Sequence, residues 1–160
     1  MSVKESIKSQ YNAALAMICQ VVTECPLELW DSPEYKNRTW NVAVHALFYT
    51  HFYLFPTAED FKPWPGVHLD GRMFDDKSEE EERQAASQKD VLDFIEFLFG
   101  QIDPLVEALD LEAESGFQWL PFKKMELQFY NIRHLVLHTG ELAERLWQDG
   151  GVEIRWVGRR

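Results

Sequence analysis

Residues 39–55 constrain the fold most, because a helix formed by this segment would be apolar around nearly its whole circumference. Its large apolar and aromatic residues are Trp40, Val42, Val44, Leu47, Phe48, Tyr49, Phe52, Tyr53, Leu54 and Phe55. A helix that is apolar on all sides must be covered on all sides. We therefore predict that this helix is capped by Thr39, ends at Pro56 and lies in the middle of a bundle.

Three further segments have the apolar periodicity of amphipathic helices. They span residues 2–24, 79–110 and 122–149. The segment at residues 2–24 starts with Ser2 and Glu5, which can form a capping box. The segment at residues 79–110 starts with an acidic run that suits a helix N-terminus, and the segment at residues 122–149 ends at Gly150. Four such helices predict one four-helix-bundle domain over residues 1–160.

Two short segments depart from the helical pattern. Residues 67–74 contain an Asp-Gly pair that is typical of a small hairpin, and residues 152–157 alternate apolar and polar side chains like a strand. Pro104 should kink the third helix or restart it. The predicted fold class is therefore an all-α four-helix bundle with long crossover connections, to which a small hairpin and a C-terminal strand are added.

Charge and cysteine content limit the partners and the location of the protein. The net charge of −11 at pH 7 argues against nucleic acid and anionic membranes, because both need a basic face. Cys19 and Cys25 lie on one predicted helix and face different directions, so we interpret them as reduced thiols. The first residues lack the apolar core of a signal peptide, and the apolar run over residues 42–55 is too short to span a bilayer. These features favour a cytoplasmic location.

His134 and His138 are four residues apart on the last predicted helix. At this spacing two side chains share one face, about 5–6 Å apart at Cβ. The same face carries Leu127, Asn131, Leu135 and Leu142, so the pair should point toward the core. In a bundle, His45 on the second helix can face the same interior point. Three neutral imidazoles suit Zn²⁺, Ni²⁺ or a similar divalent ion, and three protein ligands leave a coordination position open, as in catalytic sites.

Two stretches of this chain resemble the DinB/YfiT-like metalloenzyme superfamily. They are Trp40-Asn41-Val42-Ala43-Val44-His45-Ala46-Leu47 and His134-Leu135-Val136-Leu137-His138-Thr139-Gly140-Glu141-Leu142. Members of that superfamily pair one histidine early in the second helix with a His-x-x-x-His before Gly-Gln-Leu or a close variant; here Glu141 replaces the glutamine. The resemblance implies a four-helix bundle, often a homodimer, in which His45, His134 and His138 bind a divalent metal ion. It also implies a metal-dependent enzyme, since some relatives are S-transferases or isomerases that use a low-molecular-weight thiol.

Two more residues near the pair are candidates for a supporting role. Glu141 lies one turn beyond His138, where it can accept a hydrogen bond from a ring N–H. Arg145 is on the same face and can pair with Glu141 or bind an anionic group of a substrate. We assign packing to His51 and a solvated position to His68.

The sequence leaves several functions open. The leading hypothesis is an enzyme that acts on a small-molecule substrate with an external thiol as nucleophile, because neither Cys19 nor Cys25 is placed beside the histidines. The alternatives are a metal-binding stress-response bundle without catalysis and a metal-dependent hydrolase. In a further alternative the bundle binds no metal and its histidines are satisfied by hydrogen bonds.

Overall fold

The computed structural model describes residues 2–66, 69, 71–73 and 84–160. Over these residues it forms five helices: α1 (Val3–Glu24), α2 (Leu27–Trp30), α3 (Thr39–Phe52), α5 (Gln88–Ala108) and α6 (Lys124–Gly150). The described residues contain no β-strand beyond one isolated bridge, so the predicted all-α class is confirmed. Most of the expected hairpin at residues 67–74 lies outside the described residues, and so does His68.

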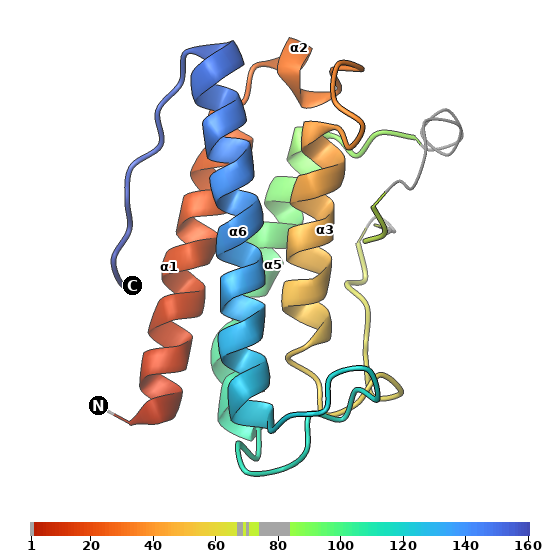
Figure 1. Cartoon of the computed structure of the whole chain (residues 1–160), viewed down its shortest axis with the longest axis vertical. Coiled ribbons are helices and arrows are strands. Elements are labelled where there is room, and N and C mark those ends of the chain that lie inside the picture. Colours follow the sequence, from red (N-terminus) through yellow and green to blue (C-terminus); the bar gives the residue numbers. More distant parts are fainter. Residues whose placement is uncertain (1, 67–68, 70, 74–83) are drawn as a thin grey trace.

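The four long helices lie side by side (Figure 1). Helix α1 packs against α5 and α6, and α3 packs against the same two helices. In the view of Figure 1, α1 and α6 run upward while α3 and α5 run downward. The consecutive helices α3 and α5 are therefore parallel, so the chain between them must return along the whole length of the molecule. Residues 53–87, the crossover, join these two helices, and the described part of this connection runs beside α3 (Figure 1).

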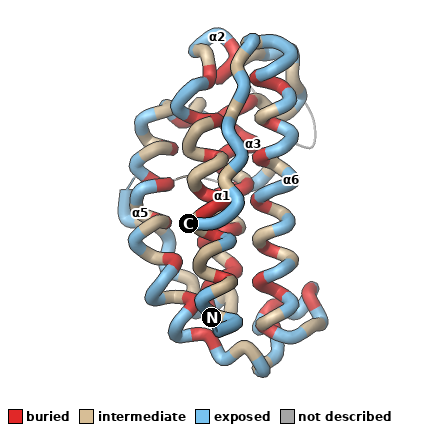
Figure 2. Tube along the Cα trace, turned by 90° about the vertical axis from the view of Figure 1, so that its left-hand side faces the viewer, coloured by how far each residue is buried: buried red, intermediate tan, exposed pale blue. Residues whose placement is uncertain are grey.

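The core lies between the four long helices, where their buried residues face one another (Figure 2). Helix α3 is buried on most of its circumference, as its apolar sequence predicted. Its residues with at most 5% exposure include Trp40, Val42, Ala43, Val44, Ala46 and Leu47. Helices α5 and α6 cover two of its sides, and the crossover covers a third, where Phe61 packs against Phe48 with ring centroids 5.6 Å apart.

Capping explains where the helices begin. Helix α1 starts with the predicted capping box of Ser2 and Glu5. Helix α5 starts at Gln88 rather than at residue 79, because Ser87 and Asp90 form a second capping box and residues 84–87 are not helical. The acidic run at residues 79–82, which predicted the earlier start, lies outside the described residues. Helix α5 also continues through Pro104 without a restart.

The expected caps and strand differ from the structure at two further places. Thr39 is the first residue of α3, and its hydroxyl accepts a hydrogen bond from Arg145 instead of capping the helix. Residues 152–157 form no strand, because no described strand lies beside them. This tail instead runs along α1 (Figures 1 and 2), where the Gln20 side chain exchanges hydrogen bonds of 2.9 and 3.0 Å with the backbone of Arg155.

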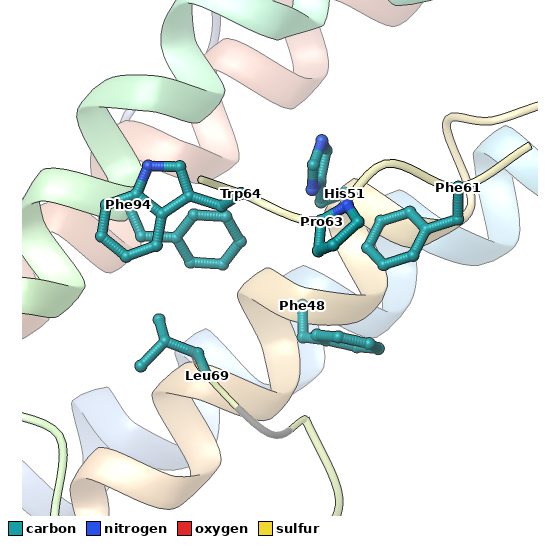
Figure 3. A pocket seen from close by; sticks show the side chains of 7 residues that line it. All are labelled: Phe48, His51, Phe61, Pro63, Trp64, Leu69 and Phe94. Atoms are coloured by element: carbon teal, nitrogen blue, oxygen red, sulfur yellow. The ribbon is translucent and has the colours of Figure 1, made fainter. Parts of the chain in front are cut away.

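His51 is buried in an aromatic cluster beneath the crossover, which confirms the packing role predicted from the sequence. It is 1% exposed, and its ring centroid lies 5.2–6.0 Å from those of Phe55, Phe61, Phe94 and Phe97. Figure 3 shows His51 beside a small cavity of about 30 Å³. Burial lowers the pKa of His51 to about 4, so the ring is neutral in the folded protein at neutral pH.

Acidification should therefore destabilise the fold through His51. In the unfolded chain the ring protonates near pH 6.5, whereas the folded protein resists protonation until about pH 4. The stability present above pH 6.5 is lost as the pH falls toward 4, by about 3 kcal/mol in all. Urea unfolding of wild type and His51→Phe at pH 7 and pH 4.5 measures this effect. The variant should lose less free energy of unfolding on acidification, and an equal loss in the two proteins would contradict the assignment.

Candidate metal centre

The packing of α3 against α6 brings three histidines together. His45 comes from the middle of α3, while His134 and His138 occupy consecutive turns of α6. Their three ring centroids are 4.7–4.9 Å apart, and each offers a ligand atom within 4.8 Å of the other two. The two closest ring nitrogens, Nε2 of His45 and Nε2 of His134, are 3.0 Å apart.

Hydrogen bonds outside the cluster fix the tautomers of two of these rings. Nδ1 of His45 lies 2.7 Å from the backbone oxygen of Gly71, and Nδ1 of His138 lies 3.1 Å from Oε2 of Glu141. Both oxygens can only accept, so each Nδ1 carries the proton and donates it. The neutral rings of His45 and His138 therefore keep Nε2 unprotonated, with a lone pair available as a ligand.

The third ring, His134, packs against the other two and is held neutral by its surroundings. Burial lowers its pKa to about 4, and the neighbouring rings of His138 and His45 add to this effect. Burial also lowers the pKa of His45, against the opposing effect of the hydrogen bond to Gly71. Neutral imidazole is the form that binds metals, so His134 keeps its ligating form down to about pH 4, and burial favours the same form of His45.

The donor set fits one divalent metal ion. Two nitrogens that each lie about 2.0–2.1 Å from a shared ion are roughly 3 Å apart, which matches the 3.0 Å between His45 and His134. An ion shared by these two nitrogens would take the place of the hydrogen bond between them. Nδ1 of His134 is buried without a hydrogen-bond partner among the described residues, and it would stay so with Nε2 on an ion. The geometry is therefore compatible with an ion held by the three rings.

Glu141 and Arg145 form a chain of hydrogen bonds behind His138. Glu141 accepts from His138 through one oxygen and from Nη2 of Arg145, at 3.1 Å, through the other. Arg145 also donates to the backbone oxygen of Asn37 at 3.0 Å, and its guanidinium lies 3.8 Å from the ring centroid of Tyr35. These contacts hold Arg145 in place behind Glu141, so it positions the carboxylate rather than facing an incoming ligand.

An open pocket reaches two of the three histidines. Its volume is about 350 Å³, and its lining residues are His45, Tyr49, Tyr53, Trp119, Tyr130 and His134. Tyr49 follows His45 by one helical turn and packs edge-on against it, with centroids 5.0 Å apart. A small molecule can therefore reach the side of the cluster that the protein leaves uncovered, which a catalytic metal site requires.

The crossover reaches the cluster through its backbone. Gly71 supplies the carbonyl that orients His45, and the next residue, Arg72, accepts a hydrogen bond of 3.1 Å from Asn41 of α3. A Cβ atom at Gly71 would lie 2.4 Å from the side chain of Phe48. Glycine at this position thus allows the crossover to approach α3 closely enough to hold His45.

Sequence reasoning missed Gly71, Trp119 and Tyr130. The Asp-Gly pair that includes Gly71 predicts a hairpin turn, and the pattern gives no sign that the Gly71 carbonyl contacts His45. Tyr130 precedes His134 by one turn of α6, so helical spacing could have indicated it. Trp119 lies in the loop between α5 and α6, and no pattern in the sequence points to its place in the pocket.

Neither cysteine lines the pocket. Cys25 is buried, its thiol lies 3.5 Å from the backbone oxygen of Pro26, and burial raises its pKa to about 11. At neutral pH this thiol is protonated and so is a weak nucleophile. The described lining of the pocket therefore supplies no thiol nucleophile.

Comparisons of this chain with protein families, curated proteins and solved structures found no match. Among the described residues, no helix is both long and apolar enough to cross a membrane. The fold and site define an all-α protein with a cluster of three histidines that could hold a metal ion.

Proposed function

We propose that this protein is a metal-dependent enzyme that binds one divalent ion, zinc or nickel, through His45, His134 and His138. The observation that carries the proposal is the convergence of three rings, two of which have their Nδ1 protons directed away by Gly71 and Glu141. The proposal includes a four-helix bundle of the DinB-like kind, as the residues around His45 and His138 suggest by resemblance.

The residues around the proposed ion would each have a separate role. Gly71 and Glu141 hold the rings of His45 and His138 in the ligating tautomer, and Arg145 holds Glu141. The pocket admits one small molecule beside His45 and His134. A divalent ion bound by three neutral ligands supplies a strong Lewis acid, which lowers the pKa of a bound water or thiol. Because the pocket offers no cysteine, we propose a small thiol as the nucleophile, in an S-transferase or isomerase reaction on a small-molecule substrate.

Metal titration tests the site itself. Protein purified without a histidine tag and treated with chelator should bind one equivalent of Zn²⁺ or Ni²⁺ and melt at a higher temperature when loaded. The metal-free protein should still unfold in one cooperative helical transition, because its apolar core is extensive without the ion. Failure to bind either ion would reject the proposal. Complete unfolding on chelation would show that the ion is structural, which counts against an enzyme.

Activity assays then separate the possible reactions. Metal-loaded protein is incubated with a panel of biological thiols and a chloro-bimane acceptor, and in parallel with ester and amide substrates. Conjugation that requires the metal and disappears in His138→Ala supports thiol transfer. Metal-dependent cleavage without conjugation would favour the hydrolase, and metal binding without either reaction would favour the stress-response alternative.

Replacing Gly71 by alanine should weaken metal binding without unfolding the protein. The added methyl group would meet Phe48 and push the crossover away, so that its carbonyl no longer fixes the ring of His45. Loss of such an orienting hydrogen bond typically lowers metal affinity about 10–100-fold. Gly100→Ala is the matched control, because a Cβ there meets nothing within 4 Å. Calorimetric zinc titrations of both variants measure the difference, and wild-type affinity in Gly71→Ala would argue against this role.

The homodimer and the cytoplasmic location stay predictions. Sedimentation of the metal-loaded protein over a range of concentrations tests the first. Localisation of the tagged protein in cells tests the second.

A further inference from the structure

We propose that the pocket beside the histidines selects small ligands that combine a neutral aromatic ring with one metal-binding oxygen or sulfur group. The inference rests on the proposed metal centre, and it names the substrate class of that site. It is drawn from the side chains that surround the opening, which the resemblance to other metalloenzymes does not describe.

Aromatic rings form all of the pocket wall outside the two histidines. Tyr49 lies edge-on to His45 and also to His134, with a centroid distance of 5.9 Å to the latter. Tyr130 is parallel to His134, with an interplanar angle of 6° and a centroid distance of 6.5 Å. Trp119 completes the lining, and its indole nitrogen lies 3.4 Å from the hydroxyl oxygen of Tyr53. The opening beside the ligating nitrogens is thus enclosed by faces and edges of rings.

Such a wall favours a ring in the ligand. Aromatic pairs in stacked or edge-to-face geometry gain more than their buried area alone gives. A volume of about 350 Å³ lies at the lower end of the range for small-molecule sites, so the pocket suits one ring with short substituents. A long flexible chain would leave most of these aromatic faces without a partner.

The charge around the pocket disfavours two other classes of ligand. Among the described residues, no lining side chain is lysine, arginine, aspartate or glutamate, so only the proposed ion could compensate a phosphorylated or multiply anionic molecule, and the remaining negative charges of that molecule would lack a partner. A divalent ion held by three neutral rings keeps its full charge, so it repels a cationic ligand at this short range. A neutral ring with a single ionisable oxygen or sulfur group avoids both penalties.

A pair of hydroxamates tests this inference, because acetohydroxamate and benzohydroxamate share one metal-binding group and differ by the ring. Binding of each to zinc-loaded protein is measured by calorimetry, and the ratio of the two affinities is compared with the ratio for free Zn²⁺. We expect the protein to prefer benzohydroxamate at least about tenfold beyond the free-zinc ratio, the gain expected for burying a phenyl ring.

Two variants show whether the pocket wall causes the preference. In Trp119→Ala and in Tyr130→Leu the preference should fall several-fold toward the free-zinc ratio, while the affinity for acetohydroxamate stays within about twofold. The matched control is Trp147→Ala, since Trp147 is 54% exposed, close to the 58% of Trp119, but does not line the pocket. This control should keep the full preference.

The outcomes separate the two proposals. A protein that takes up no zinc overturns the metal centre and this inference with it. Zinc binding with a hydroxamate ratio equal to that of free zinc overturns the ligand class alone. An aromatic preference that survives in both pocket variants also overturns it, because the ring would then bind elsewhere.

Discussion

Replacing His134 by alanine should abolish tight binding of a divalent ion. His134 packs against both of the other rings, and its Nε2 lies 3.0 Å from that of His45. Loss of a supporting hydrogen bond outside the ligand set already costs about 10–100-fold in metal affinity, so loss of a ligand should cost more than about a hundredfold. Zinc titration against a competing chelator, followed by elemental analysis after dialysis, measures the change.

The fold should survive this substitution. The side chain opens onto the pocket, and the core residues on the same helix, Leu127, Leu135 and Leu142, are untouched and fully buried. Metal-free wild type and His134→Ala should therefore have the same helical content by circular dichroism. His51→Phe serves as the control, because His51 is also a buried histidine with a lowered pKa but lies in a separate aromatic cluster. Tight zinc binding in His134→Ala, or its loss in His51→Phe, would refute the assigned ligand set.

Replacing Gly116 by alanine should destabilise the protein by at least about 3 kcal/mol. Gly116 has a φ of +80°, and a Cβ atom there would lie 1.9 Å from the backbone oxygen of Pro56. That oxygen cannot withdraw, because it accepts a hydrogen bond of 2.7 Å from the buried amine of Lys124. For a chain of this length the loss corresponds to a fall in melting temperature of roughly 6–12 °C.

A second glycine separates the two causes of this effect. Gly151 has a φ of +63°, but a Cβ there meets nothing within 4 Å. Gly151→Ala therefore carries only the cost of the left-handed backbone, about 1 kcal/mol. Thermal unfolding of the two variants should show a much larger loss for Gly116→Ala, and equal losses would mean that the contact with Pro56 is relieved by movement of the loop.

The helices and the histidine cluster could be predicted because both depend on local periodicity. Four-residue spacing places His134 and His138 on one face whatever the rest of the chain does, and the all-round apolar sequence of α3 requires a central position. The predicted start of α5 at residue 79 was wrong, because the helix begins at the capping box of Ser87 and Asp90, which apolar periodicity does not mark. The predicted strand at residues 152–157 was wrong, because an alternating pattern forms a strand only where a second strand is available to pair with it.

The surroundings of the cluster could not be predicted, because they depend on the path of the connections. The carbonyl of Gly71 reaches His45 only because α3 and α5 are parallel and the crossover returns along α3. Trp119 reaches the pocket only because the loop before α6 folds toward the end of α3. Contacts of this kind join segments distant in the sequence through backbone atoms or loop side chains. The hydrophobic pattern of the sequence does not predict them.

The separation of 89 residues between His45 and His134 has a consequence for the order of events during folding. On a growing chain His45 is synthesised long before α6, so no three-ligand site exists until the last helix has been made and has docked on α3. At the proposed metal site, capture of an ion by all three rings must then follow the docking of α6 on α3. A contact that forms after the rate-limiting step changes the unfolding rate and leaves the folding rate unchanged. A bound ion would therefore slow the unfolding of the native protein, and it would not speed the folding of the chain.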